Sequence, residues 1–78
     1  MKSRFDKALD IVRGNSVVAN DRRSGDAFAI DHKVIRRRGV RIIRPSHGIS
    51  YRMQGSLEAL ATRTDFIDGM PHYVFEVR

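Results

Sequence analysis

Apolar residues near the start of the chain recur at the spacing of a helix. The positions i, i+3, i+4 and i+7 are occupied by Phe5, Ala8, Leu9 and Val12. This spacing predicts a helix over residues 3–13 with a single apolar face. Ser3 is a suitable N-cap, and Gly14 can take the left-handed conformation that commonly ends a helix. Because a helix this short is marginal by itself, we expect it to pack on a sheet.

Beyond the helix, apolar and polar residues alternate with the period of two that is typical of β-strands. The strands predicted in this way cover residues 16–20, 27–36, 40–44, 49–53, 62–67 and 73–77. Pro45 ends the third of them because it has no amide hydrogen for the ladder. Turns and loops separate these segments, among them Asp68-Gly69, which is a strong hairpin signal. Short connections of this kind favour antiparallel neighbours.

The segment over residues 55–67 admits two interpretations. Helical spacing is present at Leu57, Leu60, Ala61 and Thr64. The hairpin signal that follows instead requires a strand directly before it. We therefore predict a strand over residues 62–67, preceded by a helical turn or bulge. Residues 49–53 alternate more clearly and predict a half-buried strand with Tyr51 on its apolar face.

Together these segments predict an α+β fold in one domain that covers residues 1–78. The expected architecture is a short N-terminal helix packed on a small, curved antiparallel sheet or open barrel of four to six strands. The chain has no cysteine, which excludes disulfide bonds and cysteine-based zinc sites. Its first residues are charged and unlike a signal peptide, and no apolar run is long enough to span a membrane. We therefore expect a cytoplasmic protein without membrane contact.

Positive charge is concentrated in residues 33–57. This segment holds seven Lys or Arg residues and no Asp or Glu, so it carries +7, whereas the remaining eight basic and nine acidic residues give −1. A disordered basic tail would lack the β-branched residues that lie between these charges. The segment therefore indicates a basic surface built into folded sheet, and the net charge of +6 favours polyanionic partners.

The predicted strands and turns divide these basic residues into two groups. Strand geometry would hold four arginine side chains in a fixed array, those of Arg36, Arg41, Arg44 and Arg52. Arg37 and Arg38 fall in a predicted turn, from which they would steer a partner more than specify it. Alternation puts Arg41 and Ile43 on one side of the strand over residues 40–44, and neither side of that strand is purely apolar. We therefore expect it to be an edge or interface strand.

Nucleic acid is the leading candidate partner, because Arg and Lys neutralise phosphates and release counterions. The predicted contact residues are Lys33, Arg36, Arg37, Arg38, Arg41, Arg44, Tyr51 and Arg52. The Tyr51 ring, with Phe28 nearby, would offer a surface for base stacking, although a core position is the commoner use of such a residue. No helix-turn-helix, Cys/His finger or basic zipper is present. An acidic protein surface is the alternative partner, and a solvated basic surface without a partner is the third interpretation.

Catalytic and metal-binding patterns are not apparent in the sequence. His32, His47 and His72 show none of the close pairings that typify metal sites. The chain also has no nucleophile motif, phosphate-binding glycine loop or recognisable carboxylate pair. We therefore expect a non-enzymatic protein with no cofactor and no bound metal.

A structural or inhibitory protein–protein interaction module is the second function class. The initial helix, the strand-rich middle and the closing hairpin, Asp68-Gly69 followed by Tyr73-Val74, form a layout that resembles small phage head–tail joining proteins. The resemblance implies an adaptor or inhibitor of a larger assembly and assigns no functional residue. The small core and the last strand, residues 73–77, also suggest a homodimer formed through an edge strand.

Overall fold

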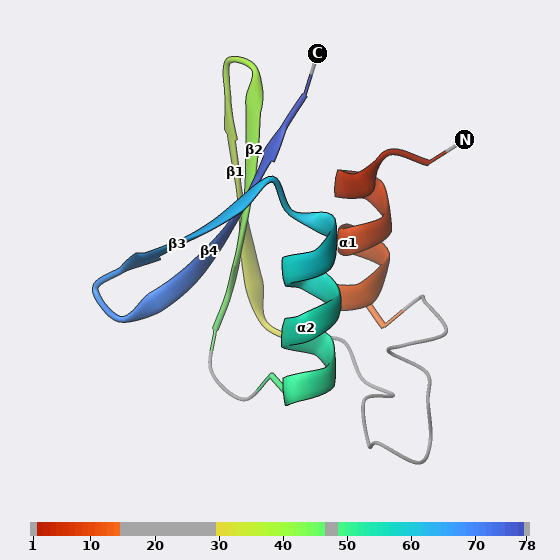
Figure 1. Cartoon of the computed structure of the whole chain (residues 1–78), viewed down its shortest axis with the longest axis vertical. Coiled ribbons are helices and arrows are strands. Elements are labelled where there is room, and N and C mark those ends of the chain that lie inside the picture. Colours follow the sequence, from red (N-terminus) through yellow and green to blue (C-terminus); the bar gives the residue numbers. More distant parts are fainter. Residues whose placement is uncertain (1, 15–29, 47–48, 78) are drawn as a thin grey trace.

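The computed structural model describes residues 2–14, 30–46 and 49–77 as two helices and four strands (Figure 1). In chain order these are α1 (Arg4–Val12), β1 (His32–Arg37), β2 (Val40–Pro45), α2 (Tyr51–Leu60), β3 (Arg63–Ile67) and β4 (Met70–Glu76). The predicted α+β class, N-terminal helix and antiparallel sheet are confirmed. The predicted strand over residues 16–20 and the beginning of the one over residues 27–36 lie outside the described residues.

The four strands form one antiparallel sheet in the order β1-β2-β4-β3. Two hairpins, β1–β2 and β3–β4, are joined by the pairing of β2 with β4. In the β1–β2 turn, Gly39 has a φ of +72°, and in the β3–β4 turn Asp68 and Gly69 have φ values of +54° and +77°. Positive φ at both central residues is the mark of the type I′ turn, whose twist matches that of the strands. The hairpin predicted from Asp68-Gly69 is therefore confirmed.

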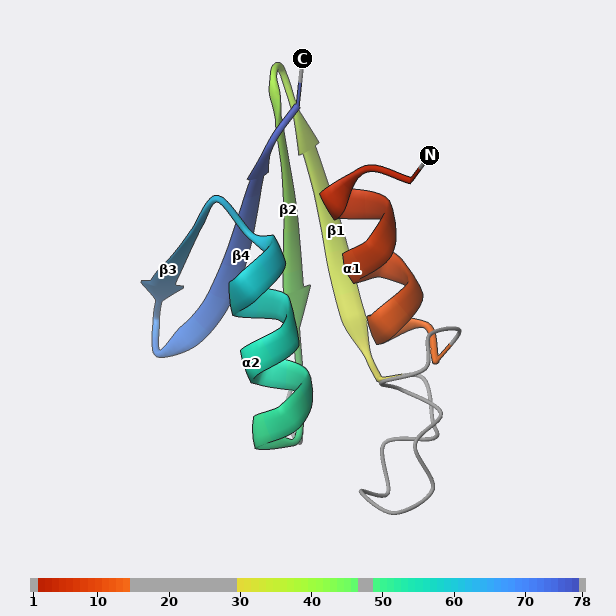
Figure 2. The ribbon, with the colours of Figure 1, turned by 45° about the vertical axis from the view of Figure 1, so that its right-hand side comes forward.

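Helices α1 and α2 lie side by side on one face of the sheet (Figures 1 and 2). The helices contribute to the core the side chains of Phe5, Ala8, Leu9, Ile11, Val12, Met53 and Leu57, and the sheet contributes Ile43, Tyr73 and Phe75. The Phe5 and Phe75 rings meet edge to face with their centroids 5.7 Å apart. Burial of such side chains, each worth about 1.5–3 kcal/mol, holds the two layers together.

Helix α1 follows the predicted pattern at both ends. Ser3 is its N-cap, and the Ser3 Oγ accepts a hydrogen bond from the Asp6 amide at 3.1 Å. Gly14, with a φ of +76°, follows the last turn, and its amide donates to the Ile11 carbonyl at 3.2 Å. Both ends could be predicted because capping depends on residues that are adjacent in sequence.

The prediction of a strand over residues 49–53 is wrong, because these residues lead into α2. Ser50 is the N-cap of this helix, and its Oγ accepts a hydrogen bond from the Met53 amide at 3.2 Å. Met53 and Leu57, four residues apart, are buried in the core, whereas Tyr51 is 93% exposed. Packing of a helical face against α1 and β4 thus outweighs the period-two alternation of a five-residue segment.

The positions of β2 and β4 in the sheet also correct the prediction. β2 is not an edge strand, since it lies between β1 and β4, and β4 offers no free edge for a dimer, since it lies between β2 and β3. Ile43, which is fully buried, places the middle of β2 beneath the helices. The edges of the sheet are β1 and β3. The strand predicted over residues 62–67 is confirmed as β3, although a full helix precedes it instead of a single turn or bulge.

Candidate nucleic-acid interface

The β1–β2 hairpin carries six of the eight residues predicted to contact nucleic acid. Val34 lies opposite Ile43 and packs against the core, so this side of the hairpin faces the helices. Side chains of alternate residues therefore point to the other side of the sheet. We call that side the open face; the hairpin contributes to it Lys33, Ile35, Arg37, Val40, Ile42 and Arg44.

Arg36 and Arg41 lie opposite each other on the helix side of the hairpin. The Arg36 guanidinium carbon is 5.7 Å from the centroid of the Phe5 ring, which is a cation–π contact. The Arg41 Nη1 donates hydrogen bonds to the carbonyl oxygens of Arg37 at 2.8 Å and Val40 at 2.9 Å. Both arginines thus stabilise the fold locally. The predicted single array of arginines is corrected, because these two face away from the basic residues of the open face.

Basic side chains lie at both ends of the open face of the hairpin, with an apolar pair between them. Lys33 lies opposite Arg44 at one end, and Arg37 adjoins the turn at the other. Ile35 and Ile42 lie opposite each other in the middle and are half-buried. Lys33 and Arg37 are exposed, and neither side chain has a hydrogen bond or ion pair within the described residues. Arg44 is half-buried, and its Nε has no hydrogen-bond partner there.

The positive charge of the hairpin is not neutralised within it. Neither its strands nor its turn contain Asp or Glu. Lys33 is paired directly with Arg44, and Arg36 directly with Arg41. Like charges in such positions destabilise a sheet. The neighbouring strand β4 contributes one carboxylate to the open face, that of Glu76 beside the turn end of the hairpin.

The last three predicted contact residues lie outside the strands of the hairpin, one in its turn and two in α2. Arg38 is exposed in the β1–β2 turn, as predicted, whereas the prediction of a turn position for Arg37 is wrong, because Arg37 pairs with Val40 as the last residue of β1. Tyr51 and Arg52 begin α2 and so belong to the helix layer, not to a strand. With 93% of its surface exposed, Tyr51 does not occupy a core position, and Phe28 lies outside the described residues. The described part of the open face has no Phe, Tyr or Trp side chain.

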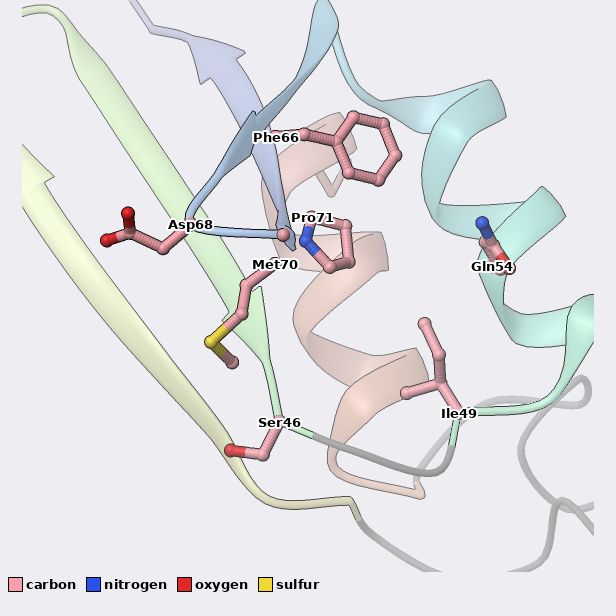
Figure 3. Close-up of a pocket in the computed structure, with 8 residues that line it drawn as sticks. Ser46, Ile49, Gln54, Phe66, Asp68, Met70 and Pro71 are labelled. Atoms are coloured by element: carbon pink, nitrogen blue, oxygen red, sulfur yellow. The ribbon is translucent and has the colours of Figure 1, made fainter.

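A pocket that the sequence did not predict lies between α2 and the β3–β4 hairpin (Figure 3). It has a volume of about 410 Å³ and is lined by Ser46, Ile49, Gln54, Phe66, Asp68, Gly69, Met70 and Pro71. Phe66 is 66% exposed, and the following residue, Ile67, is 52% exposed. The one sequence signal for this site is the pair of large apolar residues at the end of a strand that otherwise reads Arg-Thr-Asp.

The histidines of the described residues make contacts with the backbone. The Nδ1 atoms of His32 and His72 lie 2.9 and 2.8 Å from the carbonyl oxygens of Ile30 and Met70; His47 lies outside the described residues. Within the described part of the chain, no three His, Cys, Asp or Glu residues come together in a way that could hold a metal ion.

No protein-family model, curated protein or solved structure matches this chain. Among the helices that the structure describes, none is long and apolar enough to cross a membrane. A functional interpretation therefore depends on the chemistry of the two surfaces described above, the basic β1–β2 hairpin and the pocket beside the β3–β4 hairpin.

Proposed function

We propose that the protein is a non-enzymatic binding module whose β1–β2 hairpin contacts the phosphate backbone of a nucleic acid. The observation that carries this proposal is the pairing of like charges on the open face, Lys33 with Arg44. Interactions between cross-strand side chains amount to about 0.2–1 kcal/mol, and like charges make them unfavourable. A polyanion along the hairpin would be attracted to both members of such a pair and would offset their mutual repulsion. Binding of a polyanion therefore explains why the like charges are placed opposite each other.

The open face also has free donors for phosphate oxygens. The side chains of Lys33 and Arg37 are exposed and have no partner among the described residues, whereas Arg44 is half-buried, with its Nε shielded from solvent. Arg and Lys bind phosphate through charge-assisted hydrogen bonds, and the guanidinium group can do so through two parallel bonds. Three phosphate contacts from these residues would give a salt-dependent affinity of the kind seen in non-specific nucleic-acid binding.

The test is a titration of duplex and single-stranded oligonucleotides with the protein at several salt concentrations. Three phosphate contacts predict that log K for a duplex falls with log salt at a slope of about −3. The double variant Lys33→Ala/Arg44→Ala should make this slope shallower by about 2. Lys7→Ala, on the exposed side of α1, is the matched control and should leave the slope as it is.

Absence of binding to both oligonucleotides at low salt would refute the proposal. If Lys7→Ala reduced the slope and the hairpin variant did not, the binding surface would lie on the helices instead of the sheet. A circular dichroism spectrum and an unfolding curve for each variant show that any loss of binding is not a loss of folding.

A protein–protein interaction module is the second candidate, and the exposed pair Phe66 and Ile67 favours it. Both residues lie on β3, an edge strand of the sheet, and Phe66 lines the pocket beside α2. An edge strand next to a pocket of mixed polar and apolar lining is suited to an extended peptide that adds to the sheet. A stoichiometric protein that co-purifies after nuclease treatment, is lost in Phe66→Ala and is retained in Tyr51→Ala would support this function.

A further inference from the structure

The open face of the β1–β2 hairpin matches the dimensions of the DNA major groove. Lys33 and Arg37 are four residues apart on β1, which is about 13 Å along a strand, and Arg44 lies beside Lys33. The major groove of B-form DNA is about 12 Å wide, so basic side chains separated by this distance can reach phosphates on its two sides. We infer, on the basis of the nucleic-acid binding proposed above, that this face lies across the major groove of duplex DNA.

In this arrangement the two ends of the open face contact different DNA strands. Lys33 and Arg44 bind phosphates on one side of the groove, and Arg37 binds a phosphate on the other. The helices pack on the opposite side of the sheet, so they do not obstruct the approach (Figure 2). Glu76 marks where the basic surface ends, and it confines the contact to β1 and β2.

The apolar pair between the basic ends would then face the edges of the bases. Ile35 and Ile42 lie opposite each other on the open face and are half-buried, whereas Val74, the next residue of this row on β4, is 1% exposed and takes no part in the contact. Apolar side chains in the major groove contact the C5-methyl group of thymine. The hairpin should therefore prefer A·T-containing sites modestly, because it places no hydrogen-bonding side chain between its basic ends.

The same face is poorly suited to other nucleic acids. Single strands are bound largely by stacking of bases on aromatic rings, and the described part of the open face has no Phe, Tyr or Trp. The major groove of an RNA duplex is deep and narrow, and side chains do not read it. B-form duplex DNA is the ligand class that fits both the spacing and the side-chain chemistry.

The inference is tested by competition between a DNA duplex, an RNA duplex and a single DNA strand of the same sequence at low salt. The DNA duplex should bind at least tenfold more tightly than either competitor. Methylation of guanine N7 by dimethyl sulfate, which reports on the major groove, should be reduced within the bound site of a duplex that also contains guanine.

A second measurement concerns the apolar pair. Replacing thymine by uracil in the DNA duplex removes the methyl group and should weaken binding by about fourfold, the value for one buried methyl group. Ile35→Ala should abolish this difference while leaving the salt slope unchanged. Because the thymine-to-uracil comparison uses the unaltered protein, it remains informative even if the variant folds poorly.

Two kinds of failure can be told apart. Binding to DNA without protection of guanine N7, or with equal or greater affinity for the RNA duplex or the single strand, would overturn the major-groove inference and leave the proposed nucleic-acid binding intact. Absence of binding to all three oligonucleotides at low salt would refute the proposed function itself.

Discussion

Tyr73 places a polar hydroxyl group in the apolar core. Its side chain is fully buried between the sheet and the helices, and its hydroxyl has no hydrogen-bond partner among the described residues. Burial, with a smaller effect from the Glu58 carboxylate, raises the pKa of the Tyr73 hydroxyl from 10.0 to about 12. The core therefore accepts the ring for its apolar surface and disfavours the charged form of the hydroxyl.

This pKa shift predicts a loss of stability at alkaline pH. Below pH 10 the Tyr73 hydroxyl holds its proton in both the folded and the unfolded protein, so it adds no pH dependence. Between pH 10 and about 12 only the unfolded protein releases this proton, and the free energy of unfolding should fall by up to about 2–3 kcal/mol. Urea unfolding of the wild type and of Tyr73→Phe across this range measures the effect as the difference between them.

At neutral pH Tyr73→Phe should leave the free energy of unfolding unchanged or raise it by about 1 kcal/mol, since it removes an unsatisfied polar group. Tyr51→Phe is the matched control, because its hydroxyl is already exposed to water, and it should behave like the wild type throughout. A loss of more than about 1 kcal/mol in Tyr73→Phe at neutral pH would instead mean that the hydroxyl has a hydrogen-bond partner.

Neighbouring arginines on β1 should differ in what they contribute. The Arg37 side chain lies on the open face without a partner among the described residues, whereas the Arg36 side chain contacts the Phe5 ring on the helix side. Arg37→Ala should make the salt slope for duplex DNA shallower by about 1 with little change in stability. Arg36→Ala loses the cation–π contact, worth about 0.5–1 kcal/mol, but also relieves the repulsion from Arg41, so it should lower the free energy of unfolding by less than this amount and leave the slope unchanged.

Equal effects of the two substitutions on the salt slope would contradict this division of roles. They would show that nucleic acid surrounds the hairpin or contacts its tip, not one face of the sheet. Fluorescence anisotropy for binding and urea unfolding for stability, measured on the same protein preparations, separate the two quantities.

At the scale of secondary-structure elements, α2 shows what local pattern can and cannot predict. Residues 49–53 alternate like a strand, yet Ser50 caps a helix in which Met53 and Leu57 are buried four residues apart. Both periods are present in this segment, and the contact with α1 decides between them. Where one pattern stands without a competitor, as in α1 and at Asp68-Gly69, the sequence was a sufficient guide.

Two glycines, one in a helix and one in a turn, test how strongly local backbone preference determines stability. Gly55 lies inside α2, and a Cβ built on it would meet no atom within 4 Å. Gly55→Ala should therefore raise the free energy of unfolding by about 0.5–1 kcal/mol, the difference in helix propensity. Gly39→Ala should lower it by about 1–2 kcal/mol, because Gly39 has a φ of +72° in the β1–β2 turn. Thermal and urea unfolding of both variants measure the two changes, and destabilisation by Gly55→Ala would show that α2 contacts something at this position.

The candidate interface could be predicted in part. Charge can be counted, so the sequence located the basic segment, and alternation correctly separated Arg41 with Ile43 from Ile42 with Arg44. The pairing of Lys33 with Arg44 could not be predicted, because register depends on where the hairpin turns. The pocket could not be predicted either, since its lining comes from the connection between β2 and α2, from α2 itself and from the β3–β4 hairpin, which meet only in the folded chain.

At the scale of the whole molecule, the distribution of charge lowers the stability of the sheet. The chain carries a net charge of +6, and the hairpin holds like charges opposite each other in an interior and an edge strand. A chain selected for stability alone would pair Lys33 or Arg44 with a carboxylate. A single substitution on this face should therefore raise the free energy of unfolding and lower the affinity for nucleic acid.

Lys33→Glu is that substitution, because it places a carboxylate opposite Arg44. The free energy of unfolding should rise by about 0.5–1 kcal/mol as a repulsive cross-strand pair becomes attractive, while affinity for duplex DNA at low salt should fall roughly tenfold or more. Lys7→Glu on α1 makes the same change in net charge and should weaken binding much less. In an Arg44→Ala background the stability gain of Lys33→Glu should disappear, since its partner is gone. If Lys33→Glu instead lowered both stability and affinity, the paired charges would not be in conflict, and the strongest reason for assigning the hairpin to a polyanion would be lost.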